Sequence, residues 1–425
     1  MTGKHRPTRG ERVQSDNEVI EMSTHAVPKP VKIDLRSPGI VVLMVLSVVA
    51  AVLVLWRLAF GLGTITNLDD SYPWGVWIAI DVASGVALSA GGFTTAFIAH
   101  ILHRHRYEEI VRPALLTAVL GYTFVAIGVF TDLGQYYDIW HLMLPRYWQP
   151  NSVLFEVGVC VMMYLTVLWI EFIPVIVERF KGRVNLPGEA YIFNGLVERL
   201  LDLADRTLSK VMFVFVILGV VLSCAHQSSL GTLMVIAPTK VHPLWWSPFL
   251  PLMFLLSAFA VGYPMVTFES IWAHRSMGLK TNVDLLADLT KFVPPTIGLY
   301  LLVKVWDMIH RGTYVYLDDF TVQSNLFLVE LIVGTIIPLI MFSNARIRRS
   351  ESMLFLAATL YVVFGVMLNR INVFITSYSP PHTNYPYIPR VPEVLVTVGY
   401  ISMLILLYRL FVAIFPVLVV HEQER

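Results

Sequence analysis

Residues 39–60, GIVVLMVLSVVAAVLVLWRLAF, decide the fold of this chain, because they form an apolar run long enough to cross a bilayer as one helix. Nine more runs of similar length follow, at about residues 74–102, 113–133, 152–177, 210–236, 248–272, 289–309, 322–343, 353–373 and 393–418. Proline, glycine, asparagine or charged residues separate most of them. The pattern predicts an all-α, polytopic membrane protein with about ten transmembrane helices.

The composition agrees with this fold class. The 425 residues are 56% hydrophobic and 14% charged, and their mean hydropathy is +0.66. A soluble domain carries about 25% charged residues, so a soluble enzyme with a single anchor is excluded. The net charge of +1 gives no sign of a nucleic-acid partner, and the lipid bilayer is the expected environment.

The spacing of the runs predicts a domain organisation. We expect a basic cytoplasmic tail at 1–37, a first transmembrane helix at 38–61 and a last one at 392–418. Between them we expect two four-helix bundles, at 74–237 and 248–373. Residues 186–208 carry apolar side chains at helical spacing and predict a surface helix lying in the membrane interface.

Lysine and arginine alternate between the loops. The loops after the second, fourth, sixth and eighth runs are basic, whereas the opposite loops hold only Arg146, Lys240, Arg311 and Arg390. The positive-inside rule therefore predicts cytoplasmic termini in a multi-pass protein of the inner membrane. The opposite loops are rich in aromatic residues and proline, which fits an interfacial aromatic belt and a docking floor for an external partner equally well.

Ionisable residues inside the runs are the first functional signal, because such groups are costly in a bilayer. Asp81, Asp132, Glu156 and His226 all fall near the outer ends of their runs, so we expect one polar site in the outer leaflet. For Asp132, a helix cap or a pair with Arg146 is the stronger interpretation. Two later residues, Glu330 and Arg370, are expected to pair with each other.

A second polar set falls deeper in the runs. Ser84, Glu171 and Glu269, together with neighbouring hydroxyl groups, are candidates to carry protons from the cytoplasm to the outer site. For the two glutamates, snorkelling to the inner interface is an equally good interpretation.

The sequence contains no motif that is typical of a metal or nucleotide cofactor site. The only cysteines, Cys160 and Cys224, form no cluster-binding motif, so no iron–sulfur cluster is expected in this chain. His226 is the only histidine well inside a run, so we predict no haem, and no metal-site or phosphate-loop motif occurs. A quinone site fits better, because donors such as His226 or Ser228 suit its carbonyls. A secondary transporter and a plain membrane anchor are the alternatives.

Several blocks resemble a known family: FGLGTITNLDDSYPWGVWIAIDVASGVALSAGGF at 60–93, RPALLTAVLGYTF at 112–124, NSVLFEVGVCVMMY at 151–164, VMFVFVILGVVLSCAHQSSLGTLM at 211–234 and KVHPLWWSP at 240–248. They are similar to the NrfD/PsrC family of quinone-interacting membrane subunits, and within it to the HybB branch. That branch serves periplasmic [NiFe] hydrogenases. The resemblance is strong from about residue 55 to 273 and weaker beyond.

The resemblance implies a function and partners. Family members lack haem and exchange electrons with a four-cluster ferredoxin-like iron–sulfur subunit, here linked to the large and small subunits of a [NiFe] hydrogenase. The chain is then expected to pass electrons to menaquinone or ubiquinone, with proton movement as an additional hypothesis. A molybdopterin oxidoreductase is the alternative partner. The implied quinone pocket consists of Trp77, Asp81, His226, Gln227 and Ser228, with Glu156 on the proton path.

Overall fold

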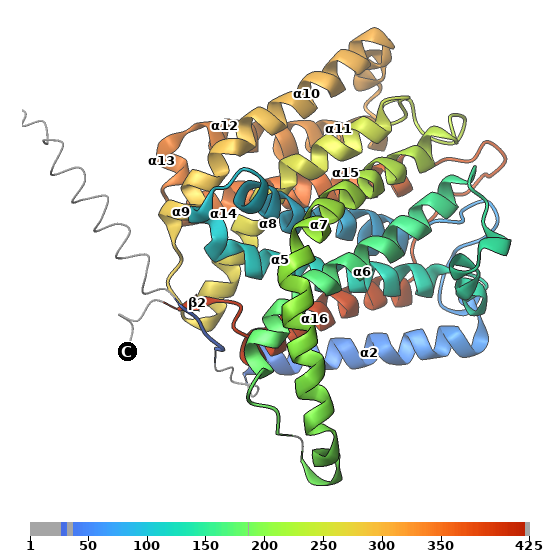
Figure 1. Cartoon of the computed structure of the whole chain (residues 1–425). Helices are drawn as coiled ribbons and strands as arrows, with labels where there is room; N and C mark the ends of the chain where they lie inside the picture. Colours follow the sequence, from blue (N-terminus) through green and yellow to red (C-terminus); the bar gives the residue numbers. More distant parts are fainter. Residues whose placement is uncertain (1–26, 32–36, 186, 421–425) are drawn as a thin grey trace, which may run out of the picture.

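The computed structural model describes residues 27–31, 37–185 and 187–420 (Figure 1). Within this part of the chain, ten helical segments are long and apolar enough to cross a membrane, and each overlaps one predicted run. They are Pro38–Phe60, Trp77–Ile101, Glu108–Asp132, Val153–Phe180, Lys210–Val235, Leu250–Met277, Val283–His310, Val322–Ser343, Glu351–Thr376 and Val391–Ile414. The prediction of an all-α, multi-pass membrane protein is confirmed. Most of the predicted tail at 1–37 lies outside the described residues.

Five of the ten spans are single α-helices: α2 (Pro38–Phe60), α5 (Glu108–Asp132), α6 (Val153–Phe180), α8 (Leu250–Met277) and α16 (Val391–Ile414). A sixth is the second half of α7 (Asn194–Val235). The other four are composite and change helix type along their length. The second comprises η2 (Trp77–Ser84), α3 (Gly85–Leu88), α4 (Ala90–Ala96) and η3 (Phe97–Ile101).

The other three composite spans also consist of α-helical segments joined by 3-10 or π-helical segments. The seventh comprises α9 (Val283–Leu289), η8 (Thr290–Phe292) and α10 (Val293–His310). The eighth comprises α11 (Val322–Leu331), η10 (Ile332–Ile336) and α12 (Ile337–Ser343), and the ninth α14 (Glu351–Thr359), η11 (Leu360–Met367), α15 (Leu368–Ile371) and η12 (Asn372–Thr376). The segments η2, η3, η10, η11 and η12 are π-helical, a geometry that is rare and frequent at functional sites.

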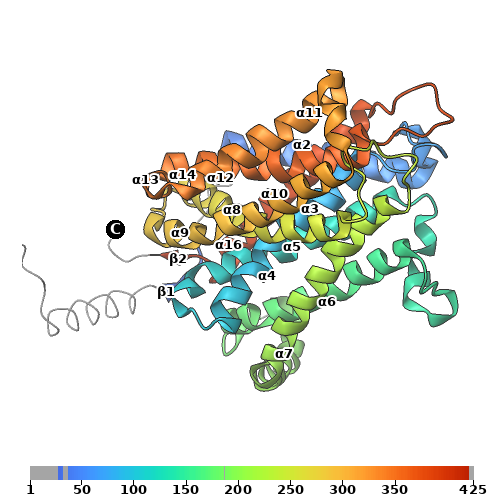
Figure 2. The same cartoon turned by 90° about the horizontal axis from the view of Figure 1, so that it is seen from above.

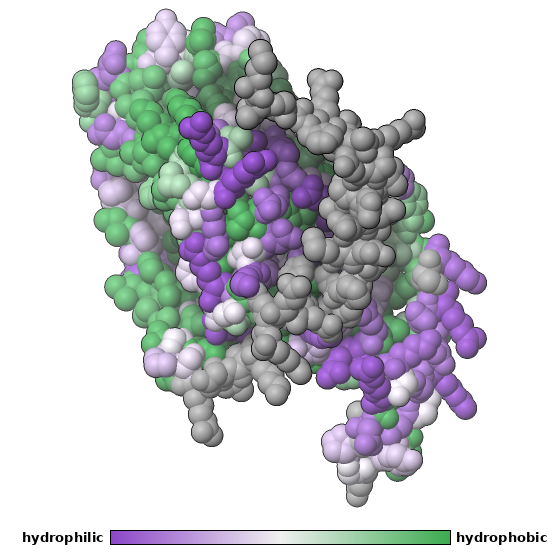
Figure 3. All heavy atoms as spheres, turned by 90° about the vertical axis from the view of Figure 1, so that its left-hand side faces the viewer, coloured by the Kyte–Doolittle hydropathy of each residue, from purple (hydrophilic) through white to green (hydrophobic). Residues whose placement is uncertain are grey.

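The two ends of the bundle differ in chemistry. One end, at the left of Figure 1, carries the basic loops, the short helix α13 (Ala345–Arg348) and the paired strands β1 (Val27–Pro28) and β2 (Val419–Val420). We call it the basic end. Figure 3 looks onto it and shows hydrophilic residues gathered across it, with hydrophobic residues on the flanks. The opposite end carries the aromatic loops, with the short helices η1 (Leu62–Thr64), η5 (Tyr136–Met143), η6 (Pro145–Tyr147) and η9 (Thr313–Asp319), and we call it the aromatic end.

The second span lies at the centre of the bundle and is the most buried of the ten. Its α4 segment packs against α5 and α8, while α6 packs along α7 and α2 along α16. Small residues permit these approaches, as is usual between transmembrane helices. A Cβ atom added at Gly399 of α16 would lie 2.1 Å from the Cβ of Ala50 on α2. The proposed division into two four-helix bundles stays a prediction.

Helix α7 differs from the predicted separate surface helix. After the short turn η7 (Gly188–Phe193), it runs for 42 residues without a break, and its first half extends beyond the spans. Figures 1 and 2 show this half running across the direction of the spans at the basic end. Its apolar side chains are exposed, with Leu196, Leu200 and Leu203 each more than half accessible. This placement fits a helix whose apolar face lies in the membrane interface.

Candidate functional site

The most unusual polar side chain of the membrane-spanning part is His226 on α7. It is completely buried, and its Nδ1 lies 3.2 Å from the hydroxyl oxygen of Tyr122 on α5. Its second ring nitrogen, Nε2, has no hydrogen-bond partner in the structure. A buried polar atom without a partner is costly and rare in a folded protein, so it indicates a missing partner such as a ligand.

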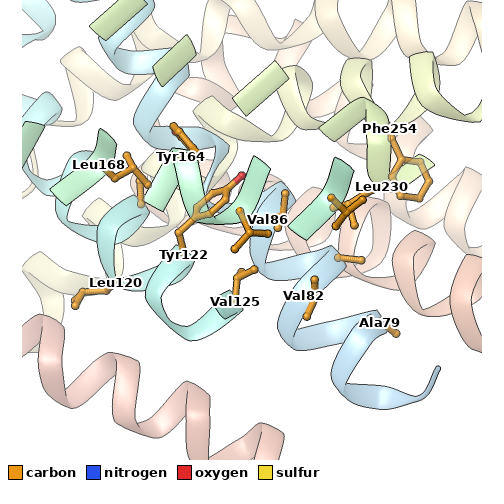
Figure 4. Packing of buried hydrophobic residues seen from close by; sticks show 14 of the residues in the cluster. Ala79, Val82, Val86, Leu120, Tyr122, Val125, Tyr164, Leu168, Leu230 and Phe254 are labelled. Carbon is orange, nitrogen blue, oxygen red and sulfur yellow. The ribbon is translucent and has the colours of Figure 1, made fainter. Parts of the chain in front are cut away.

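Further polar side chains follow the His226–Tyr122 contact along α5, α6 and α7 toward the basic end. The rings of Tyr122 and Tyr164 meet edge to face, with centroids 4.5 Å apart, and both side chains are buried (Figure 4). Ser223, one turn before His226, faces both tyrosine hydroxyls. Farther along α6, Glu171 lies against Gly219 of α7, where an added Cβ atom would come within 2.7 Å of its carboxylate. These residues form a polar column within an otherwise apolar core.

The residues that follow His226 connect α7 to the central span. Gln227 is buried, and its amide donates a hydrogen bond of 2.8 Å to the backbone oxygen of Val86. Its Oε1 atom has no partner. Ser228 is partly buried, and its backbone oxygen accepts a bond from Thr232. Two neighbouring residues, His226 and Gln227, therefore each hold one unpaired polar atom inside the core.

Trp77 and Asp81 lie on the π-helical segment η2 and face the last helix. The indole nitrogen of Trp77 donates to the backbone oxygen of Glu393 over 3.0 Å. The hydroxyl of Thr397, one turn later on α16, donates to a carboxylate oxygen of Asp81 over 2.9 Å. Spacing four residues apart places Trp77 and Asp81 on one side of the helix, so both contact α16.

Asp132 does not pair with Arg146 as expected. Its charged neighbour is Arg57 of α2, whose guanidinium is fully buried and donates to the backbone oxygen of Leu133. Arg57 also lies over the ring of Tyr136, 5.0 Å from its centroid. Nothing in the sequence favoured Arg57, because it is distant from Asp132 along the chain and lies on another helix.

The predicted site residues thus form two clusters rather than one pocket. Trp77 and Asp81 face α16, where Asp81 also abuts Gly128 of α5. His226 faces α5, where it contacts Tyr122, and Gln227 faces α3, where it contacts Val86. No hydrogen bond in the described part of the chain joins the two clusters.

The predicted proton-path residues are also dispersed. Glu156 lies in the first turn of α6 and is exposed, nearer the aromatic end than expected. The hydroxyl of Ser84 donates to the backbone oxygen of Ala79 within its own helix. Glu269 on α8 faces α5 and α16, whereas Glu171 faces α7. The four do not form a continuous path.

The sequence did not predict a role for Tyr122, Tyr164, Ser223 or Thr397. Each lies inside an apolar run, where tyrosine and hydroxyl residues are common and cost little, so their identity alone carries no signal. For Tyr122, Tyr164 and Thr397, only the position one helix away from His226 or Asp81 distinguishes them, and that position is a tertiary property. Ser223 lies on the same helix as His226, and its spacing of three residues is a signal that the sequence does contain.

A different buried cluster occupies the spans after α8. The carboxylate of Glu330 on α11 accepts hydrogen bonds from Lys304 of α10, the indole of Trp245, and the amides of Asn369 and Asn372. The predicted pair between Glu330 and Arg370 is therefore wrong. Arg370 instead donates to Asn369 and Ser257, at 2.6 and 2.7 Å.

Comparisons with known proteins identify the family. Residues 64–381 match the family described as polysulphide reductase, NrfD. The "Probable Ni/Fe-hydrogenase 2 b-type cytochrome subunit" of Escherichia coli K12 is 32% identical over 92% of this chain and 95% of its own length. The "Menaquinone reductase, integral membrane subunit" of Nitratidesulfovibrio vulgaris is 25% identical over 84% and 87%. A selenate reductase subunit of Mesobacillus selenatarsenatis is 24% identical over 88% and 93%.

The name of the Escherichia coli relative corrects one prediction. That protein is named a b-type cytochrome subunit, a class defined by haem, so the prediction that this chain binds no haem is wrong by this finding. Among the described side chains, His226 is the only fully buried histidine, and its free Nε2 suits an axial ligand. Three other described histidines, His100, His274 and His310, lie in the last turns of their spans, away from His226.

The match to the family model and the relative at 32% identity both cover most of the chain. They agree with a helical bundle of ten candidate spans and with polar side chains buried in its core. The chain belongs to the NrfD family of membrane subunits.

Proposed function

We propose that the chain is the quinone-reactive membrane subunit of a respiratory complex. Electrons would reach it from a four-cluster iron–sulfur subunit at the aromatic end, with a periplasmic [NiFe] hydrogenase as the catalytic module. The relatives' names support a role in hydrogenase and reductase complexes. The observation that carries the proposal is the buried pair of unpaired polar atoms at His226 Nε2 and Gln227 Oε1.

The geometry suits reduction of a carbonyl. Reducing a quinone to a quinol consumes two electrons, which come from the partner, and two protons, which the protein must supply. With the tautomer that carries hydrogen on Nε2, His226 donates a hydrogen bond to a quinone oxygen and then its proton. The hydroxyl of Tyr122, 3.2 Å from Nδ1, can replace that proton from the other side of the ring.

The polar column then supplies Tyr122. Tyr164 and Ser223 lie beside its hydroxyl, and Glu171 continues toward the basic end. The positive-inside rule places the basic end in the cytoplasm, so protons would be drawn from that side. The same column would supply both protons in turn, because Asp81, held by Thr397, belongs to the other cluster. This relay replaces the path through Glu156 and Ser84.

A second candidate is the membrane subunit of a molybdopterin-type reductase. The similarity to a protein named as part of a selenate reductase favours it, although the identity of 24% is lower than that to the hydrogenase relative. The site chemistry would be the same, and only the partner would differ.

Affinity purification separates these candidates. A tag on this chain, gentle extraction from native membranes and mass spectrometry should recover hydrogenase large and small subunits with an iron–sulfur protein. The same preparation should reduce a soluble menaquinone analogue with hydrogen. A molybdopterin subunit in their place would favour the second candidate, and a chain that purifies alone and binds no quinone would contradict both.

A further inference from the structure

A groove near the basic end, away from His226, has the features of a second ligand site. It has a volume of about 280 Å³ and lies between α8 and α16, with Thr117 of α5 on its floor. Helix α5 packs against both neighbours, whereas α8 and α16 do not pack along each other. The groove therefore opens between two helices toward the lipid. Its volume is close to the ~300 Å³ at the lower end for small-molecule pockets.

The walls of the groove are largely apolar, with Ser276 and Arg409 as polar lining residues, and they are partly rigid. Met265, Phe268 and Trp272 of α8 face Ile401 and Leu404 of α16. Phe268 is held in place by Phe355, whose ring stacks on it with an interplanar angle of 11° and a centroid distance of 5.3 Å. Such a wall accepts a flat ring or an isoprenoid chain.

Three polar atoms meet at the bottom of this apolar groove. The carboxylate of Glu269 faces the hydroxyls of Thr117 and Tyr408. Glu269 Oε1, Thr117 Oγ1 and Tyr408 Oη are all buried, yet none makes a hydrogen bond of normal geometry. Buried polar atoms that come together from three helices without a well-formed hydrogen bond can take a ligand oxygen as a further partner.

The depth of this polar group restricts the ligand. Glu269 precedes the end of α8 at Met277 by eight residues, which at 1.5 Å per residue is about 12 Å inside the basic end. A charged lipid head group would have to leave the interface to reach it, at a high cost. An uncharged ring oxygen has no such cost. A carbonyl would accept from Tyr408 or Thr117, and a hydroxyl would donate to Glu269.

We propose that this groove binds an uncharged amphipathic ligand of the quinone type, with one ring oxygen between Thr117, Glu269 and Tyr408 and the tail along α8 and α16. The site is separate from that at His226 and lies nearer the basic end. It needs no electron transfer, and it holds the ligand in either its quinone or its quinol form.

Photolabelling of the purified complex tests this site. An azido-naphthoquinone should label residues 265–277 and 401–409 above the level on lipid-facing α2. Ala273→Trp fills the groove and should lower this labelling by about tenfold or more. The matched control is Ile340→Trp, which adds a tryptophan at a position of α12 that is 62% exposed, and it should leave the labelling unchanged.

A second variant keeps the test valid if Ala273→Trp fails to assemble. Thr117→Val combined with Tyr408→Phe removes both hydroxyl donors with little change of volume, and should lower labelling several-fold. Labelling no stronger than on α2, or labelling unaffected by either variant, would overturn the proposal. Preferential labelling by a photoreactive phosphatidylcholine that displaces the quinone would also overturn it.

Failure of this second site is distinguishable from failure of the proposed function. Labelling requires no turnover, so His226→Ala should leave the groove labelled even where quinone reduction is lost. Conversely, a complex that reduces quinone normally but never labels the groove contradicts the second site alone.

Discussion

Two buried polar groups, Glu330 after α8 and His226 with Gln227 before it, differ in whether their hydrogen-bonding atoms have partners. After α8, Glu330 accepts hydrogen bonds from four donors, and Lys304 pairs with it directly. Before α8, His226 and Gln227 are equally buried but leave Nε2 and Oε1 without partners. Burial alone therefore does not identify a functional group in this protein.

This difference separates buried groups that stabilise the fold from those that are candidates to bind a ligand. A carboxylate whose acceptor positions are filled by protein donors is part of the architecture, and removing one partner leaves a costly charge. A buried ring nitrogen with nothing beside it costs stability unless something else binds there. We therefore expect a structural role for the Glu330 cluster, and we propose a ligand-binding role for His226.

The largest expected effect is on stability and comes from removing one partner of the Glu330 cluster. Lys304→Met leaves Glu330 buried without its cation, and the loss should be about 3–5 kcal/mol of folding stability. Thermal unfolding of the purified complex, or the amount of folded chain in membranes, measures it. Combining Lys304→Met with Glu330→Leu should recover much of the stability. A single variant as stable as the wild type would show that the cluster is not structural.

The next effect concerns the ligand-binding side. His226→Ala should lower hydrogen-dependent quinone reduction by about 100-fold, within the range for loss of a general acid, while hydrogen oxidation with a soluble dye continues. His310→Ala, on an exposed histidine at the aromatic end, is the control and should change neither rate. Equal loss of both activities in His226→Ala would indicate failed assembly and place His226 with the structural group.

A smaller effect sharpens the role of the column behind His226. Tyr122→Phe keeps the ring against Tyr164 but removes the hydroxyl at Nδ1. Quinone reduction should fall by about tenfold and show a larger solvent isotope effect, because the histidine then regains its proton more slowly. Unchanged rates and isotope effect would mean that protons reach the site by another route.

The smallest effect lies in the loops of the aromatic end. Hydrogen bonds from Tyr385, Tyr72 and Ser71 lower the pKa of Asp69, so its stabilising contribution is present above the unfolded pKa of about 3.9 and disappears as pH falls through the lowered value. Asp69→Asn should lower the melting temperature on the order of 1 °C at pH 7 and less in acid. Asp70→Asn, at the exposed neighbour, is the control. If the melting temperature of Asp69→Asn were lowered by the same amount at every pH, the loss would not come from the lowered pKa of Asp69.

The sequence predicted the number of spans and their positions well, because a long apolar run has only one stable form in a bilayer. It also gave His226 and Asp81 as candidate site residues, because a buried ionisable side chain is costly in lipid, and their role stays a prediction. It did not predict which neighbour each group meets. Asp81 meets Thr397, and Glu330 meets Lys304, across distances that depend on helix rotation and on π-helical turns. The periodicity of apolar residues contains no information about helix rotation or about where a π-helical turn occurs.

The continuity of α7 has a consequence for variation among related chains. One unbroken helix carries the exposed apolar residues Leu196 and Leu200 and, farther on, His226. The spanning half is held in place by α6. Each residue inserted between the two halves would rotate the first half by about 100° and turn its apolar face toward water. Insertions and deletions should therefore accumulate in the loops of this protein and be excluded from the middle of α7.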